Sequence, residues 1–234
     1  MGETVFTNVS VIDGTGAKPF DGAVLIRGDR IAEVVRGDIG DCGEAAIVDG
    51  GGATLMPGLI DAHAHLSFLD AATLGDINSL SAERHVLEAA KNARKMLDHG
   101  FTSMFSGSSA RDNLEVALRD AINAGDIPGP RLKAATRQMT VTGGFGDIGQ
   151  DDAYSLVLDG PEAFRKACRA AARAGVDTFK IVPSAQGTGP DPLAEDTAMS
   201  EDEVAAVCAV ARQRGRMVAA HARSAEAVKI CVRN

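Results

Sequence analysis

Strand-like and helix-like segments alternate strictly along the chain from residue 55 onward. Several segments with apolar residues at helical spacing end at a glycine, as helices commonly do: Gly100, Gly125, Gly175 and Gly215. Short apolar runs of strand length lie between these segments. Parallel strands need a long crossover connection, usually a helix, so this alternation predicts βα units that build a parallel sheet.

The predicted strands are too few to close a (β/α)8 barrel. Strands are predicted over residues 55–65, 102–105, 132–135, 177–182 and 217–221, and helices over 82–99, 113–124, 161–174, 201–214 and from Ser224 onward. A closed (β/α)8 barrel typically takes about 250 residues. We therefore expect an α/β fold with an incomplete (β/α)8 TIM barrel that comprises its first five strands. The alternative, an open doubly wound sheet, calls for a G-x-G-x-x-G turn after a strand, and the sequence has none there.

The first 54 residues have a different pattern. They read as short strands joined by Gly and Asp turns, and Gly28-Asp29 between residues 23–27 and 30–35 predicts a hairpin. No helical segment is evident, and Gly50-Gly51-Gly52 resembles a junction. We expect a small β-sandwich-like domain over residues 1–54, followed by the barrel domain over residues 55–234.

Composition excludes several classes of function. The formal net charge of −8 argues against a nucleic-acid-binding surface. No apolar run is long enough to span a bilayer, so no membrane partner is expected. The first ten residues lack the basic and apolar pattern of a signal peptide. The four cysteines form no C-x-x-C pair, which is typical of free thiols in a reducing compartment. These features predict a cytoplasmic protein.

Two histidines close the first predicted barrel strand. The segment Pro57-Gly58-Leu59-Ile60-Asp61-Ala62-His63-Ala64-His65 places them two residues apart. Residues two apart on a strand point to the same face, so His63 and His65 can present their imidazoles to one metal ion. A bare H-x-H pair is more often incidental on a surface strand. The apolar lead-in and the further candidate ligands downstream favour a metal site.

Lys180 and His221 are the further candidate ligands, because both lie near the carboxyl ends of predicted strands, where barrel active sites are found. Central parallel strands are buried on both faces, and a buried ammonium group is costly. Lys180 either extends its amine out of the sheet or has a lowered pKa and a neutral amine, which can add carbon dioxide to form a carbamate. His221 alone would be interpreted as a core histidine. His85 and His99 are assigned no functional role, and His99 fits the carboxyl end of a helix, where a cation is favourable.

The order of these motifs resembles the amidohydrolase superfamily of metal-dependent hydrolases. The resemblance covers almost the whole chain, and its closest likeness is to the imidazolonepropionase and Xaa-Pro or Xaa-Arg dipeptidase-like group, with phenylurea- and carbamate-cleaving relatives also similar. It rests on the segment 57–65, Gly100-Phe101-Thr102-Ser103, Gly129-Pro130-Arg131, Thr142-Gly143-Gly144, Lys180 and His221-Ala222.

This resemblance implies a binuclear metal hydrolase of C–N bonds in amides, dipeptides, carbamates or ureas. His63 and His65 would hold the first divalent metal ion, carbamylated Lys180 would bridge two ions, and His221 would hold the second. The two ions are expected to be zinc. A metal-bound hydroxide would attack the carbonyl carbon of a small-molecule substrate. The resemblance leaves homo-oligomerisation open.

The chain departs from the family pattern in its extent and in its pocket. The family has a histidine on the sixth strand and a general-base aspartate at the end of the eighth, and neither has a counterpart here. We therefore expect an N-terminal fragment that is inactive by itself. Phe145 stands where dipeptidase-like members often have histidine, and Arg223 where they often have tyrosine. Phe105-Ser106 replaces an Arg-Asp pair. We expect Phe145 and Arg223 to contact the substrate.

Two other interpretations stay open at this point. The chain could be a non-catalytic truncated or split piece that needs a partner chain to supply the remaining strands. It could also be a one-metal deaminase of the same superfamily. Such deaminases use the first-strand histidine pair but need no lysine on strand four, so Lys180 counts against this interpretation.

Overall fold

The computed structural model describes residues 2–149, 154–185 and 196–234, and it divides the chain into two compact units, Met1–Gly58 and Leu59–Asn234. Strand β5 (Thr54–Leu55) pairs in parallel with β1 (Glu3–Val11), with Leu55 opposite Val11. That pairing assigns the beginning of the predicted barrel domain to the first unit.

The first unit is a β-sheet. Its other strands are β2 (Phe20–Arg27), β3 (Arg30–Arg36) and β4 (Ala46–Asp49), in the order β3-β2-β1-β4. The predicted hairpin is present: β2 and β3 are antiparallel, and Gly28 in the turn between them has a φ of 63°, which glycine adopts without strain. Val9, Val11 and Val24 form the core of this sheet.

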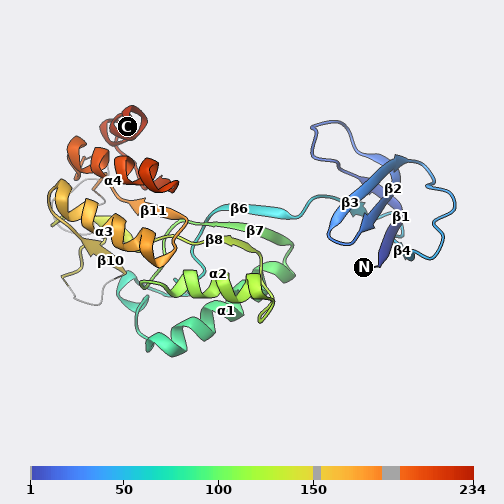
Figure 1. Ribbon diagram of the computed structural model, residues 1–234, viewed down its shortest axis with the longest axis horizontal. Helices are drawn as coiled ribbons and strands as arrows, with labels where there is room; N and C mark the ends of the chain where they lie inside the picture. The colour runs from blue at the N-terminus through green and yellow to red at the C-terminus, as the bar shows by residue number, and fades with distance from the viewer. Residues whose placement is uncertain (1, 150–153, 186–195) are drawn as a thin grey trace. The chain divides into compact units, whose positions relative to one another are not determined.

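The second unit consists of alternating strands and helices, as Figure 1 shows, which confirms the predicted α/β class and partial barrel. Its elements are β6 (Leu59–Ala64), η1 (Leu74–Asp76), α1 (Ala82–Asp98), β7 (Phe101–Ser106), α2 (Leu114–Ala124), β8 (Arg131–Lys133), β9 (Gln138–Thr140), β10 (Ser155–Val157), α3 (Pro161–Ala174), β11 (Thr178–Ile181), α4 (Glu201–Arg214), β12 (Met217–Ala220) and α5 (Ala225–Arg233).

The strands of this unit are parallel and, apart from β10, follow one another in chain order, so that they form one curved wall. One sheet has the order β6-β7-β8 and another the order β10-β9-β11-β12. A parallel bridge between Ala135 and Thr178 joins the two, and Ile181 of β11 pairs with Met139 of β9. Strands β8 and β9 are therefore two parts of the third barrel strand. All carboxyl ends of the barrel strands lie along one edge of the wall.

The structure differs from the predicted elements in two places. The strand predicted over residues 55–65 is interrupted by Pro57, which has no N–H group to donate to a ladder. Strand β6 begins at Leu59, whose N–H group donates to the carbonyl of Gly100 at 2.8 Å. Strands β9 and β10 were not predicted, because each has three residues and such short segments show no periodicity.

The helices cover one face of the wall and supply its hydrophobic core. Helices α1 and α2 pack with β7 and β8 around Met104, Leu118 and Leu132. Helices α3 and α4 pack against β9 and β11 around Phe164 and Phe179. Both clusters are buried and closely packed, so they hold the strands, and with them the carboxyl ends of the strands, in fixed positions. Within the described part of the chain, no helix has the length and apolar character needed to cross a membrane.

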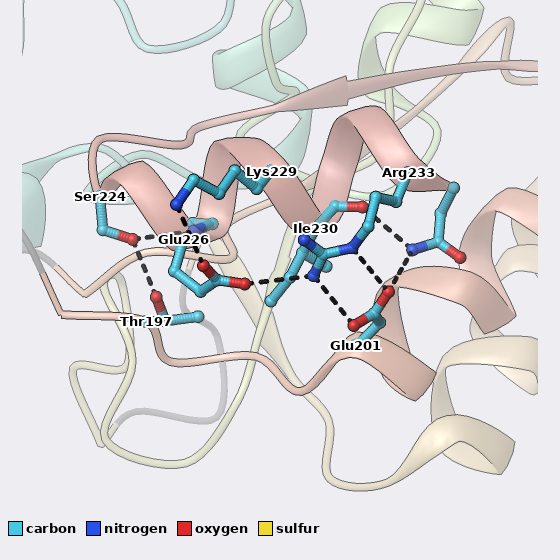
Figure 2. Close-up of polar contacts among 9 residues, drawn as sticks. Thr197, Glu201, Ser224, Glu226, Lys229, Ile230 and Arg233 are labelled. Carbon is cyan, nitrogen blue, oxygen red and sulfur yellow. Dashed lines mark hydrogen bonds and ion pairs between the residues drawn. The ribbon is translucent and has the colours of Figure 1, made fainter.

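Helix α5 is anchored to helix α4 by charged and polar contacts, as Figure 2 shows. The Arg233 guanidinium lies 3.0 Å from the Glu201 carboxylate and 3.1 Å from that of Glu226. The Ser224 hydroxyl caps the helix by accepting from the Ala227 N–H group, and it lies 2.9 Å from the Thr197 hydroxyl. These contacts hold the segment that immediately follows His221.

Candidate metal centre

His63 and His65 converge on one point at the end of β6. Their ring centroids are 5.1 Å apart, and their planes are tilted by 55°. A Cβ atom placed on Gly107, the residue after β7, would lie 2.6 Å from Nε2 of His63 and 2.9 Å from Nε2 of His65. Both Nε2 atoms therefore border the same small space above Gly107. Two imidazole nitrogens that face one point are suited to share a metal ion.

The orientation of His65 is set by its other ring nitrogen. Nδ1 lies 3.2 Å from the carbonyl oxygen of Ser108, which can only accept, so Nδ1 carries the hydrogen and the Nε2 lone pair is free. The ring also stacks on Phe68, with centroids 4.3 Å apart. Burial lowers the pKa of His65 to about 4. The imidazole is therefore neutral near pH 7, as a metal ligand must be.

Lys180 is a buried lysine that faces the histidine pair. Its side chain is 1% exposed, and Nζ lies 3.2 Å from Nε2 of His63. Phe179 and Ile181 pack in the hydrophobic core. Successive residues of a strand point to opposite faces, so Lys180 points away from that core. Burial lowers the pKa of Lys180 to about 8, which raises the fraction of neutral amine at neutral pH.

His221 lies on the neighbouring strand and keeps an unpartnered nitrogen. Its backbone N–H group donates to the carbonyl of Ile181 at 2.9 Å, directly beside Lys180. Nε2 of His221 is buried, and no group in the described residues hydrogen-bonds to it. Burial lowers the pKa of His221, and the charges of Lys180, Arg223 and His63 lower it further. A buried, neutral ring nitrogen without a partner is costly unless a ligand such as a metal ion satisfies it.

These donors fit a divalent metal only if Lys180 contributes. Within the described ranges, no three His, Cys, Asp or Glu side chains lie close enough together to hold a metal ion. His63, His65 and His221 supply imidazole nitrogens, and Lys180, whose Nζ lies 3.2 Å from Nε2 of His63, could supply an anionic ligand after carbamylation. Imidazole with a carboxylate-like oxygen is a donor set that suits zinc and similar metals.

The two predicted substrate-contacting residues flank His221. The Phe145 ring stacks on the His221 ring, with centroids 5.4 Å apart and an interplanar angle of 23°. Arg223 is exposed, and its backbone N–H group donates to the Ser184 hydroxyl at 2.8 Å. The Arg223 charge lowers the pKa of His221, so its guanidinium lies close enough to act electrostatically on that ring.

Sequence reasoning missed the residues that hold the candidate ligands in place. Gly107 provides the space between the two imidazoles, and Ser108 orients His65. The Thr136 hydroxyl accepts from the backbone N–H group of Lys180 at 2.9 Å, and the Thr136 carbonyl accepts from Ser109 at 2.9 Å. For Gly107 and Ser108, the position directly after a barrel strand was the available signal, because barrel active sites are built from such loops. Thr136 lies in the break between β8 and β9 and gave no such signal.

Comparison with known proteins identifies the family to which the chain is similar. The model of the amidohydrolase family matches residues 54–233. The chain is similar to a prolidase crystallised with N-methylphosphonate-L-proline (29% identity, TM-score 0.87), covering 99% of this chain and 59% of the prolidase. It is also similar to a Xaa-Pro dipeptidase with bound methionine in the active site (26% identity, TM-score 0.86), covering 99% of this chain and 59% of the dipeptidase.

Phenylurea hydrolase B is a further similar structure, at 25% identity and a TM-score of 0.78, covering 99% of this chain and 57% of that one. None of the curated proteins matches the chain. The chain thus spans less than two thirds of the length of these solved structures.

Proposed function

Because the chain belongs to the amidohydrolase family, we propose that its site hydrolyses C–N bonds of small molecules at a centre of two divalent metal ions, with zinc as the expected metal. The observation that carries this proposal is the convergence of His63 and His65 above Gly107, with Lys180 Nζ 3.2 Å from His63. This places a lysine that is 1% exposed beside two neutral imidazoles.

In this proposal His63 and His65 would hold the first ion, His221 would hold the second, and carbamylated Lys180 would supply an anionic ligand to them. The neutral amine of Lys180 attacks carbon dioxide, so that an N–C bond forms and one proton is released. The product is a carboxylate on the lysine arm, and its negative charge is attracted to dications that would repel an ammonium group. When bound, the metal supplies water activation and polarisation of the substrate carbonyl.

The chain's own residues prepare the site for this chemistry. Ser108 holds His65 in the tautomer that leaves Nε2 free, and Thr136 fixes the backbone at Lys180. Phe145 covers one face of the His221 ring, which limits the access of water to that ligand. These groups keep the donors in place before the substrate arrives, which reduces the reorganisation needed during reaction.

The substrate class is proposed from the relatives and from the two flanking residues. The similar structures bear the names prolidase, Xaa-Pro dipeptidase and phenylurea hydrolase, which share the cleavage of a C–N bond next to a carbonyl. Phe145 offers apolar contact, and the Arg223 guanidinium offers a planar fork suited to a carboxylate. We propose amides or dipeptides with a free carboxylate as the preferred substrates, with carbamates and ureas as the alternative.

Arg223→Met is expected to lower kcat/KM for carboxylate-bearing substrates by roughly 10–100-fold, because a charge-assisted hydrogen bond contributes roughly 1.5–3 kcal/mol. Hydrolysis of the corresponding neutral amides should change little. Steady-state kinetics on paired substrates, with and without the carboxylate, would measure this difference. Arg169→Met, at an exposed position on α3, is the matched control. Equal effects on both members of each pair would remove Arg223 from substrate binding.

Completion of the barrel is a separate requirement for turnover. In the described residues β6 pairs only with β7 and β12 only with β11, so both are edge strands with unpaired backbone groups. These edges favour the alternative that the chain needs further strands, from the same polypeptide or from a partner, before it works as an enzyme. The sixth-strand histidine and the general-base aspartate would come from those strands.

The proposal is tested by assaying residues 1–234 and the product of the complete reading frame in parallel. Both are loaded with zinc and offered N-acyl amino acids, dipeptides, carbamates and phenylureas. We expect turnover of at least one class by a completed barrel, its loss in His65→Ala, and near-background rates for residues 1–234 alone. A completed, zinc-loaded barrel that cleaves none of the four classes would contradict the proposed function.

The location of the protein is also proposed. Cys42, Cys168, Cys208 and Cys231 are free thiols in the structure, and burial raises the pKa of the Cys168 thiol to about 12. Free thiols are stable in a reducing compartment, which supports a cytoplasmic location.

A further inference from the structure

A buried polar network lies directly behind the histidine pair, and Ser67 is its centre. Ser67 follows His65 by two residues and is fully buried. Its hydroxyl donates to Oε1 of Glu115 at 2.8 Å and accepts from the backbone N–H group of Ala110 at 2.8 Å. Its carbonyl oxygen accepts from Nε2 of His85 at 2.5 Å. Ser67 therefore uses both its side chain and its backbone to connect three other segments.

His85 is locked in one tautomer by a charged donor. The side chain is fully buried on α1, and its Nδ1 lies 3.2 Å from Nε of Arg111. An arginine guanidinium can only donate, so Nδ1 of His85 accepts and its Nε2 carries the hydrogen. Arg111 in turn donates to the carbonyls of Asn78 and Leu80, at 3.1 and 2.7 Å. The direction of each hydrogen bond from Arg111 to Ser67 is thus determined.

Glu115 is a buried carboxyl group whose hydrogen-bond partner is a neutral hydroxyl. It is fully buried in the first turn of α2 and accepts from the Ser67 hydroxyl at 2.8 Å. Burial raises that pKa to about 7, and the hydroxyls of Ser106 and Ser67 act in the opposite direction. A buried carboxyl group costs free energy that an apolar side chain of similar size would not cost. Its presence beside the candidate site calls for a role other than packing.

The network reaches the metal site through two loops. Ser67 belongs to the loop after β6, which also carries His65. Ala110 belongs to the loop after β7, which also carries Gly107 and Ser108, the two residues that border and orient the imidazoles. The hydrogen bond between Ala110 and the Ser67 hydroxyl therefore joins the loop that carries His65 to the loop that carries Gly107 and Ser108. Glu115 and His85 hold Ser67 from two further sides.

We propose that Ser67, His85 and Glu115 are positioning residues that preorganise His63 and His65 for metal binding. This inference rests on the proposed function, because it assigns the network to the metal site of that function. Outer groups that orient ligands typically change metal affinity or activity by 10–100-fold when they are removed. A network that served packing alone would change the stability of the fold and leave metal affinity unaltered.

The test measures cobalt(II) binding to the 234-residue chain by its visible absorption, which reports both affinity and ligand geometry. Ser67→Ala removes one hydroxyl, and Glu115→Ala removes its acceptor. Both are expected to weaken cobalt binding about 10–100-fold and to alter the visible spectrum. Glu115→Gln keeps an acceptor for Ser67 and should recover most of the affinity that Glu115→Ala loses. His85→Gln is measured as well, with the thermal unfolding of each metal-free variant as the check on folding.

Two matched controls and one reference variant make the outcomes distinct. Glu88→Gln, on α1, and His99→Gln, at the residue that follows α1, change the same residue types and should bind cobalt as the wild type does. His65→Ala should abolish tight binding. If the wild-type chain binds no cobalt, this inference is overturned, whereas the proposed function is judged separately by the assay of the completed barrel. If His65→Ala loses cobalt while Ser67→Ala and Glu115→Ala keep wild-type affinity and spectrum, only the positioning role is overturned.

Discussion

Replacement of Lys180 by alanine is expected to lower the zinc affinity of the chain by more than about 100-fold, the upper end of what outer groups cost. Lys180 is a buried residue that could carry an anionic ligand, and burial lowers the pKa of His63, His65 and His221, which makes them neutral donors. Without the lysine, the described residues offer no set of three conventional metal ligands. The loss should therefore exceed that caused by any outer group.

Metal content after dialysis and cobalt titration would measure the effect. Lys180→Met keeps the aliphatic length and should lose metal equally, while the metal-free chain unfolds at a similar or higher temperature, because an apolar group replaces a buried amine that has no carboxylate partner among the described residues. Lys229→Met, at an exposed position on α5, is the control. Acetate or propionate should restore metal binding to Lys180→Ala by replacing the missing carboxylate. Full metal content in Lys180→Ala without such additives would exclude the bridging role.

The elements of the barrel could be predicted because their signals are local. Helix α4 begins at the Ser200–Glu203 capping box and ends at Gly215 with a φ of 60°, and both features are visible in the sequence. Strand β9 gave no such signal, because it is three residues long and continues the third barrel strand after a break. A pattern of period two cannot be recognised in so short a segment.

The candidate ligands could be predicted, but the groups that hold them could not. His63 and His65 stand out because their spacing alone places them on one face of a strand. Ser67 and Glu115 meet across 48 positions of sequence, and the contact depends on how α2 packs against the end of β6. His85 was interpreted as a structural histidine, and its role becomes visible only when Arg111 and Ser67 are seen on either side of its ring.

Gly107 provides the most selective test of the histidine pair, because its backbone does not require glycine. Its φ lies outside the left-handed region, so alanine is compatible with the main-chain conformation. The added methyl group would nevertheless lie 2.4 Å from Cδ2 of His63 and 2.9 Å from Nε2 of His65. Atoms cannot approach this closely, so at least one imidazole must move. His63 is exposed and can turn toward solvent at little cost to the fold.

We therefore expect Gly107→Ala to lower metal affinity by more than about 100-fold while the metal-free chain unfolds within a few degrees of the wild type, since a shift of that size corresponds to about 1 kcal/mol or less. Gly75→Ala is the matched control, because its added methyl group would make one ordinary contact, 3.8 Å from the Thr73 hydroxyl. Cobalt titration measures the metal affinity of both variants, and thermal unfolding measures their stability. Wild-type cobalt affinity in a folded Gly107→Ala chain would mean that the two Nε2 atoms do not share an ion in the space above Gly107.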